Sequence, residues 1–346
     1  MTVVSSAALL SAARADSAAD FYKGRNLAIL VGSGAGGGYD TTTRLLARFW
    51  QKHIPGPPAV VVQDMPGAGG IKMQNYLDHQ APRDGSVVAA TRAAFVAGPL
   101  IPAFAGSALG DYDPRNVNWI GNISGQWGGC FVWHTVPVKT IQDAMKTQVI
   151  IGSTSPRANS STIAGILNAL IGTKFKVVSG FSTSGTYLAM EQGEIQGSCV
   201  SYETASAAAP RLIDEGKLRF LIQIGLTRSK LQPDVPAVGE LLTNEEDRQV
   251  VRLVAASLIM GRPYLAPPGV PKDRLAALRT SFMATMRDPA YVAAARKEKL
   301  IVDASDYKEM EALIADTYTI PEAAVKRTRT MLANAWKGSK KKDKKK

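Results

Sequence analysis

Residues 32–40, GSGAGGGYD, form a glycine-rich loop whose residue types could bind an anion. An apolar run at residues 28–31 precedes the loop, and apolar residues at helical spacing follow it from Leu45 to Ile54. Free backbone N–H groups of such a loop, together with the positive end of a following helix, can hold a carboxylate or a phosphate. The first candidate ligand group is therefore Gly36, Gly37, Gly38, Tyr39 and Asp40.

Three of these glycines, Gly32, Gly34 and Gly37, also match the G-x-G-x-x-G pattern of dinucleotide-binding proteins. That pattern needs a strand before it, a helix opening within it and an acidic residue about 20 positions later. The strand and an acid, Asp64, are present, but the best helix cap is Asp40, after all the glycines. No phosphate-loop lysine follows them. We therefore expect no nucleotide and no other cofactor, and a nucleotide-binding α/β enzyme remains the alternative.

Two further loops, residues 152–162 and 180–186, are rich in hydroxyl groups, and each lies between a β-type run and a helical pattern. In open α/β sheets, ligands bind beyond the carboxyl ends of the strands. Neutral N–H and O–H donors there suit a carboxylate, and the planar guanidinium of Arg157 could take both of its oxygens, with Arg92 as its competitor. The candidates from these loops are Thr154, Ser155, Arg157, Asn159, Ser160, Ser161, Thr183, Ser184 and Gly185.

Six other candidates follow apolar runs that should end at the same cleft. They are Thr91, Phe95, Gln126, Trp127, Ser201 and Tyr202.

Catalytic and metal-binding groups are not recognisable. No G-x-S-x-G nucleophile motif occurs, and the three histidines, His53, His79 and His134, are scattered. We therefore expect a binding protein with no metal site and no enzymatic activity.

The chain of 346 residues is long enough for about two domains, and 45% hydrophobic with 20% charged residues is typical of a globular protein. Apolar runs such as residues 59–63 and 86–90 alternate with helical patterns such as residues 71–80. This alternation predicts an α/β fold with a parallel sheet covered by helices. Residues 93–110 carry no charge, but Pro99 and Pro102 argue against a membrane-spanning helix there.

Both ends of the chain have unusual composition. The net charge is +12, and half of it comes from residues 337–346, which we interpret as a solvated tail and not as a nucleic-acid site. The short apolar run before Ala13-Arg14-Ala15 resembles a signal peptide, although no basic residue precedes it. We expect the protein to be exported. Cys130 and Cys199 could form a disulfide in an oxidising compartment, but their spacing alone leaves this open.

Taken in order, several segments resemble the substrate-binding receptors of tripartite tricarboxylate transporters, the Bug-type periplasmic receptors. The matching segments are the opening strand with its glycine loop, VVVQDMPGAGG, GSTSPRANSSTIAGIL, FSTSGTYLAMEQGEIQG, GKLRFL and LAPPGVPKDRLAALRTSF. The resemblance implies a type II-like periplasmic binding protein with two α/β lobes, each a mixed sheet flanked by helices. A small organic acid, monocarboxylate or dicarboxylate and sometimes aromatic, would bind between them.

The resemblance also implies domain bounds and partners. Residues 1–20 would be a signal remnant and disordered N-terminus, residues 21–129 plus 254–333 lobe one, residues 130–253 lobe two, and residues 334–346 a disordered tail. The protein would act as a monomer that delivers its ligand to integral membrane transporter subunits.

Overall fold

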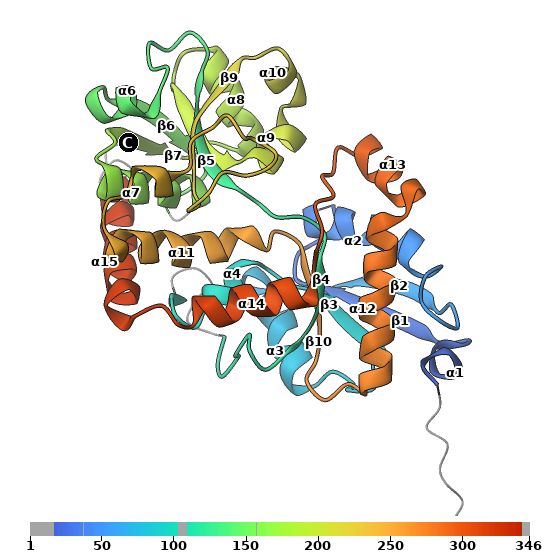
Figure 1. Ribbon diagram of the computed structural model, residues 1–346. Coiled ribbons are helices and arrows are strands. Elements are labelled where there is room, and N and C mark those ends of the chain that lie inside the picture. The colour runs from blue at the N-terminus through green and yellow to red at the C-terminus, as the bar shows by residue number, and fades with distance from the viewer. Residues whose placement is uncertain (1–16, 37, 103–108, 157, 341–346) are drawn as a thin grey trace, which may run out of the picture.

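The computed structural model describes residues 17–36, 38–102, 109–156 and 158–340. The described chain forms two lobes, each built on one β-sheet with helices against it (Figure 1). The elements of the first lobe, in chain order, are α1 (Ala18–Tyr22), β1 (Asn26–Val31), α2 (Gly38–Trp50), β2 (Ala59–Asp64), η1 (Ala68–Gly70), α3 (Ile71–His79), β3 (Val87–Ala90), α4 (Ala94–Ala97), β4 (Asn118–Asn122), β10 (Pro263–Ala266), α12 (Lys272–Arg287), α13 (Pro289–Lys297), β11 (Ser305–Asp306) and α14 (Tyr307–Thr317).

The second lobe is formed by the middle of the chain. Its elements are β5 (Gly128–Trp133), α6 (Ile141–Lys146), β6 (Val149–Ser153), α7 (Asn159–Ile171), β7 (Phe175–Ser179), α8 (Thr183–Glu191), β8 (Gly197–Ser201), α9 (Tyr202–Ala208), α10 (Pro210–Asp214), β9 (Leu218–Gln223) and η2 (Val238–Leu241). Two long helices, α11 (Glu245–Ile259) and α15 (Glu322–Lys340), lie at its side facing the first lobe (Figure 1).

The sheet of the first lobe is mixed, with the strand order β11-β4-β10-β3-β1-β2. Strand β1 pairs in parallel with β2 and with β3, whereas β10 runs antiparallel to β3 and β4. The apolar face of α2 packs under this sheet through buried Leu45, Leu46 and Trp50. Trp50 also donates its indole N–H to the hydroxyl of Ser281, at 2.9 Å, so its polar atom is satisfied in the core.

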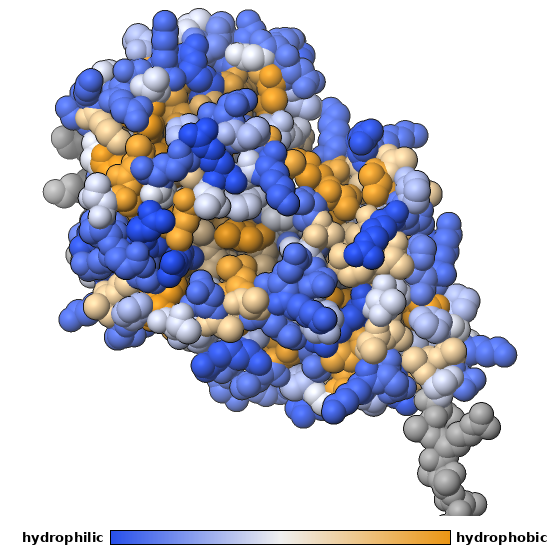
Figure 2. All heavy atoms as spheres, viewed as in Figure 1, coloured by the Kyte–Doolittle hydropathy of each residue, from blue (hydrophilic) through white to orange (hydrophobic). Residues whose placement is uncertain are grey.

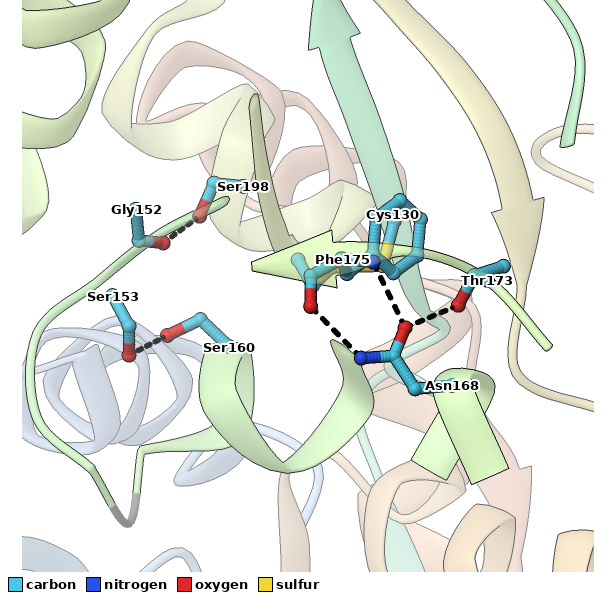
Figure 3. Close-up of a disulfide and its surroundings, with 9 residues drawn as sticks. Cys130, Gly152, Ser153, Ser160, Asn168, Thr173, Phe175 and Ser198 are labelled. Carbon is cyan, nitrogen blue, oxygen red and sulfur yellow. Dashed lines mark hydrogen bonds between the residues drawn. A yellow bond between two sulfur atoms is a disulfide. The ribbon is translucent and has the colours of Figure 1, made fainter. Parts of the chain in front are cut away.

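The sheet of the second lobe has the order β7-β6-β8-β5-β9. Strands β7, β6 and β8 are parallel neighbours, and β5 is antiparallel to β8 and β9. Cys130 of β5 lies directly opposite Cys199 of β8, and the two form a disulfide. Figure 3 shows Cys130 of this disulfide together with Ser153 of β6 and Ser198 of β8. The pairing that the sequence left open is therefore present in the fold.

Helices α11 and α15 join the lobes on one side. Helix α11 packs against α4 and α15, and one apolar cluster contains Ala97 and Ile101 of the first lobe with Val250 and Leu253 of α11. Helix α15 packs on α7 of the second lobe. Residues 322–333, which the resemblance assigned to lobe one, therefore lie in a helix that packs on the second lobe.

Other predicted bounds shift as well. Strand β5 begins at Gly128, two residues before the predicted start of lobe two. Helix α1 already covers residues 18–20, and helix α15 covers residues 334–340, so these two segments are not disordered. Residues 1–16, with most of the predicted signal peptide, and residues 341–346 lie outside the described residues. Among the described helices, none combines the length and hydropathy that crossing a bilayer requires.

A hydroxyl-lined cleft between two lobes

The strand-to-helix loops of the second lobe surround a cavity of about 220 Å³, which we call the hydroxyl cavity. Its apolar lining includes Ile163, Tyr187, Val200 and Leu258. Figure 2 shows a hollow with hydrophobic side chains between the two lobes. The polar side chains around the cavity are those of Gln126, Thr154, Asn159, Ser160, Thr183, Thr186, Ser198, Ser201 and Thr204.

Several of these hydroxyl groups are already used within the fold. The Ser160 hydroxyl lies 2.6 Å from that of Ser153, and Ser198 donates to the carbonyl of Gly152 at 2.9 Å (Figure 3). Ser201 caps α9 by accepting the N–H of Thr204 at 3.1 Å. These bonds hold the walls of the cavity in place.

Other polar groups of the cavity are not used in this way. Within the described part of the chain, no hydrogen-bond partner contacts the side chains of Gln126, Thr154, Asn159 and Thr183. Helix α7 also begins at the cavity, and Ala158 at its N-cap supplies no side-chain acceptor for the first N–H groups. Unused donors and a positive helix end make this cavity suitable for an anion.

A second cavity, of about 230 Å³, adjoins the first and is lined by Gln126, Asn159, Ile163 and Leu258 in common with it. Arg92 and Arg262 line its first-lobe side, and we call it the arginine cavity. A third hollow, of about 310 Å³, continues past Gln126 and Arg262 to Glu203. Gln126 is therefore at the centre of the cleft, where the chain passes from β4 to β5.

The glycine loop of the first lobe contributes less than predicted. Tyr39 lines the arginine cavity together with Asn159, so the first and second predicted loops do meet across one cavity. Helix α2, however, begins at Gly38, so the predicted cap, Asp40, lies within its first turn. Asp40 is buried, and its carboxylate accepts the N–H of Gly36 at 2.8 Å and contacts Arg44 at 2.6 Å. Asp40 thus fixes the loop and does not face a cavity. Gly37 lies outside the described residues.

Thr91 and Phe95 do not reach the cleft, because both side chains are fully buried. Phe95 packs edge to face against Tyr112. The Thr91 hydroxyl donates to Gln74, whose amide in turn donates to the carboxylate of Asp78 at 3.1 Å. These side chains form a buried polar chain beneath the sheet.

The buried carboxyl group of Asp78 predicts a pH dependence of stability. Burial raises the pKa of Asp78 to about 6. Because the pKa is higher in the folded protein than in the unfolded chain, the free energy of unfolding falls as pH rises from about 4 to about 6. The Asp78→Asn side chain cannot ionise. Near pH 7.5 the variant should therefore be more stable than the parent by about 1 kcal/mol, a value that allows for the partial solvent exposure of this site. Near pH 4 it should show no advantage. Urea unfolding at both pH values measures this, and equal differences at both would contradict it.

The remaining predicted residues differ in whether they line a cavity. The residues that line the hydroxyl cavity are Thr154, Asn159, Ser160, Thr183, Ser201 and Gln126. Ser161 is buried and bonds to Ser153, and Gly185 donates its N–H to the Ser182 cap of α8. Ser155, Ser184, Trp127 and Tyr202 do not line these three cavities. Arg157 lies outside the described residues.

Sequence reasoning missed Arg262 and Glu203. Glu203 is partly buried, and burial raises the pKa of its carboxyl group. It accepts the backbone N–H of Trp127 at 3.3 Å. Arg262 precedes strand β10 in the segment MGRP, where the missed signal was a cation directly after the end of a helix and before an apolar strand.

Among the residues that the structure describes, no group of His, Cys, Asp and Glu side chains could hold a metal ion.

Comparison with known proteins supports the resemblance. Residues 44–329 match the model of the TctC family, described as "Tripartite tricarboxylate transporter family receptor". The chain is 28% identical over 291 residues to the UPF0065 protein in the gbd 5′ region of Cupriavidus necator, covering 82% of this chain and 81% of that protein.

Solved structures show the same fold. A TctC solute-binding protein from Polaromonas, solved without ligand, superposes with a TM-score of 0.68 at 18% identity, covering 88% of this chain and 99% of that one. MatC from Rhodopseudomonas palustris, with bound malate, gives a TM-score of 0.56 at 18% identity, covering 89% and 99%. These matches confirm the predicted two-lobed fold. The family match spans most of the sequence, and the chain therefore belongs to the tripartite tricarboxylate transporter receptor family.

Proposed function

We propose that this protein is a periplasmic receptor that captures a small organic carboxylate between its lobes and delivers it to the membrane subunits of a tripartite tricarboxylate transporter. The observation that carries the proposal is the hydroxyl cavity. Unused side-chain donors of Asn159, Thr183 and Thr154 and the uncapped start of α7 line one small cavity. Neutral donors and a helix N-terminus stabilise a carboxylate without a metal or a fixed cation.

The family membership and the cysteines support the rest of the proposal. The family is named for transport receptors, and one structural neighbour holds malate. The disulfide between Cys130 and Cys199 is typical of proteins that fold in an oxidising compartment such as the periplasm, and it supports export by the predicted N-terminal signal. The cleft would be the ligand site because both lobes contribute to its walls.

A thermal-shift screen with small organic acids tests the proposal. Free acid at about 100 times its dissociation constant should stabilise the folded protein by roughly 2.7 kcal/mol, because only the folded state binds it. Calorimetric titration of the best acid then gives the affinity and a stoichiometry near one per chain. A panel of nucleotides, ATP and NAD among them, is the negative control. Micromolar binding of a nucleotide with no binding of any acid would overturn the proposal.

A further inference from the structure

The arginine cavity holds two positive charges that the fold does not neutralise. Among the described residues, no carboxylate lies within ion-pair distance of Arg92 or Arg262, whereas other arginines on the first lobe, such as Arg44 and Arg279, have acidic partners at 3.0 Å or less. Arginines without acidic partners that face a shared cavity are unusual, because self-repulsion and partial desolvation both raise their free energy. The cavity is therefore suited to an anion.

Arg262 is held in place by neutral contacts. Its Nη1 donates to the carbonyl of Gly261 at 2.9 Å, and its guanidinium lies over the Tyr39 ring, 4.5 Å from the centroid. A Cβ on Gly38 would lie only 3.0 Å from Nη2, so the glycine lets the guanidinium lie against the first turn of α2. The positive end of α2 adds to the positive potential at this point.

Arg92 reaches the same cavity from the segment before α4. Its Nη1 donates to the carbonyl of Gly69 at 2.8 Å, and its guanidinium lies 5.7 Å from the centre of the Phe95 ring. These contacts orient the side chain but leave other N–H groups of the fork unused among the described residues. The opposite wall includes Trp336 of α15, whose indole N–H donates to Thr162 at 3.2 Å.

We propose that Arg92 and Arg262 form a second anion subsite that selects ligands with two acidic groups. This inference rests on the proposed function, since it places a first carboxylate in the hydroxyl cavity. The two cavities share Ile163 and Leu258, which offer an apolar path between them. One acid group would bind the hydroxyl donors of the second lobe, and the other would bind the guanidinium forks of the first.

The acid Glu203 does not remove this charge. It lines the neighbouring hollow together with Arg262 and interacts with it electrostatically, but it is not within ion-pair distance in the described structure. The subsite can therefore take a ligand anion. A guanidinium that donates two parallel hydrogen bonds favours a carboxylate, which has two acceptor oxygens, over a group with one acceptor atom.

Paired ligands test the inference. Each diacid is compared with a monoacid of equal carbon number or ring: succinate with butyrate, adipate with hexanoate, and terephthalate with benzoate. The parent should bind at least one diacid about tenfold or more tightly than its monoacid. Arg262→Met, which keeps an apolar stem, should weaken binding of that diacid roughly 10- to 100-fold and change the monoacid by about twofold or less.

Arg92→Met should reduce the same preference and serves as an independent variant if Arg262→Met melts early. The matched control is Arg211→Met, which removes an equal charge from an exposed position on α10 and should leave both affinities unchanged. Equal losses for diacid and monoacid, or no loss for either in both variants, would overturn the inference and leave the carboxylate receptor intact. A parent that binds no acid in any pair would overturn the proposed function and this inference together.

Discussion

Replacing Cys130 and Cys199 together by alanine should lower the free energy of unfolding by about 2–4 kcal/mol. The disulfide joins residues separated by 69 positions, so its removal returns many conformations to the unfolded chain. Both side chains are fully buried in the second lobe, and the lost sulfur contacts add to the cost. Urea unfolding of parent and variant under identical conditions measures the difference.

Reductant provides the internal control. With excess reductant, the parent should lose most of its advantage and unfold at a urea concentration close to, but not below, that of the double variant, because the reduced cysteines keep their buried sulfur contacts. The variant itself should not respond. If the oxidised parent and the variant unfold together, the disulfide contributes nothing to stability. The same pair of proteins also shows whether the two lobes unfold together. If they unfold separately, loss of the disulfide should shift only the unfolding transition of the second lobe.

The cysteines show where prediction from sequence stops. Their spacing permits a disulfide but does not require one. The pairing follows from the antiparallel register of β5 with β8, in which Cys130 is directly opposite Cys199. That register depends on the order of strands in the sheet, which is set by packing between distant segments and not by the local pattern around either cysteine.

Local patterns predicted the strand–loop–helix units well. The apolar run at residues 59–63 became β2, Ala59–Asp64, and the helix expected at residues 71–80 became α3, Ile71–His79. These elements could be predicted because hydrophobic periodicity directly reflects which face of a strand or helix is buried. The start of α2 was misplaced because aspartate is a common helix cap. Asp40 instead lies within the first turn and accepts the N–H of Gly36.

Contacts between distant segments could not be predicted in this way. Tyr39 and Arg262 both belong to the first lobe but are more than two hundred positions apart in the sequence, and the Arg262 guanidinium lies over the Tyr39 ring. Helix α15 follows α14 of the first lobe but packs on α7 of the second. Such non-local contacts leave no periodic signal in the sequence. The loop motifs therefore predicted second-lobe residues of the cleft but not Arg262 or Glu203.

The double variant Asn159→Ala with Thr183→Val should weaken binding of the best acid from the screen roughly 100-fold or more. Each side chain lines the hydroxyl cavity, and neither has a hydrogen-bond partner among the described residues. A hydrogen bond to a carboxylate contributes about 1.5–3 kcal/mol, so two lost bonds exceed the effect of either single change. Because both groups would contact one ligand, the combined loss should fall short of the sum of the single losses. Calorimetric titration measures all three variants.

Matched changes in the same two loops separate loss of binding from loss of structure. Ser155→Ala and Ser184→Ala remove one hydroxyl from each loop at positions that do not line the cavity, and they should bind the acid as the parent does. The double variant should melt within a few degrees of the parent, because Asn159 and Thr183 are exposed and cap no helix. If the control variants lose as much affinity as the double variant, the loops act through their conformation and not through these two donors. If the double variant binds unchanged, the Asn159 and Thr183 side chains do not contact the acid, and the proposed role of these two donors in the hydroxyl cavity is wrong.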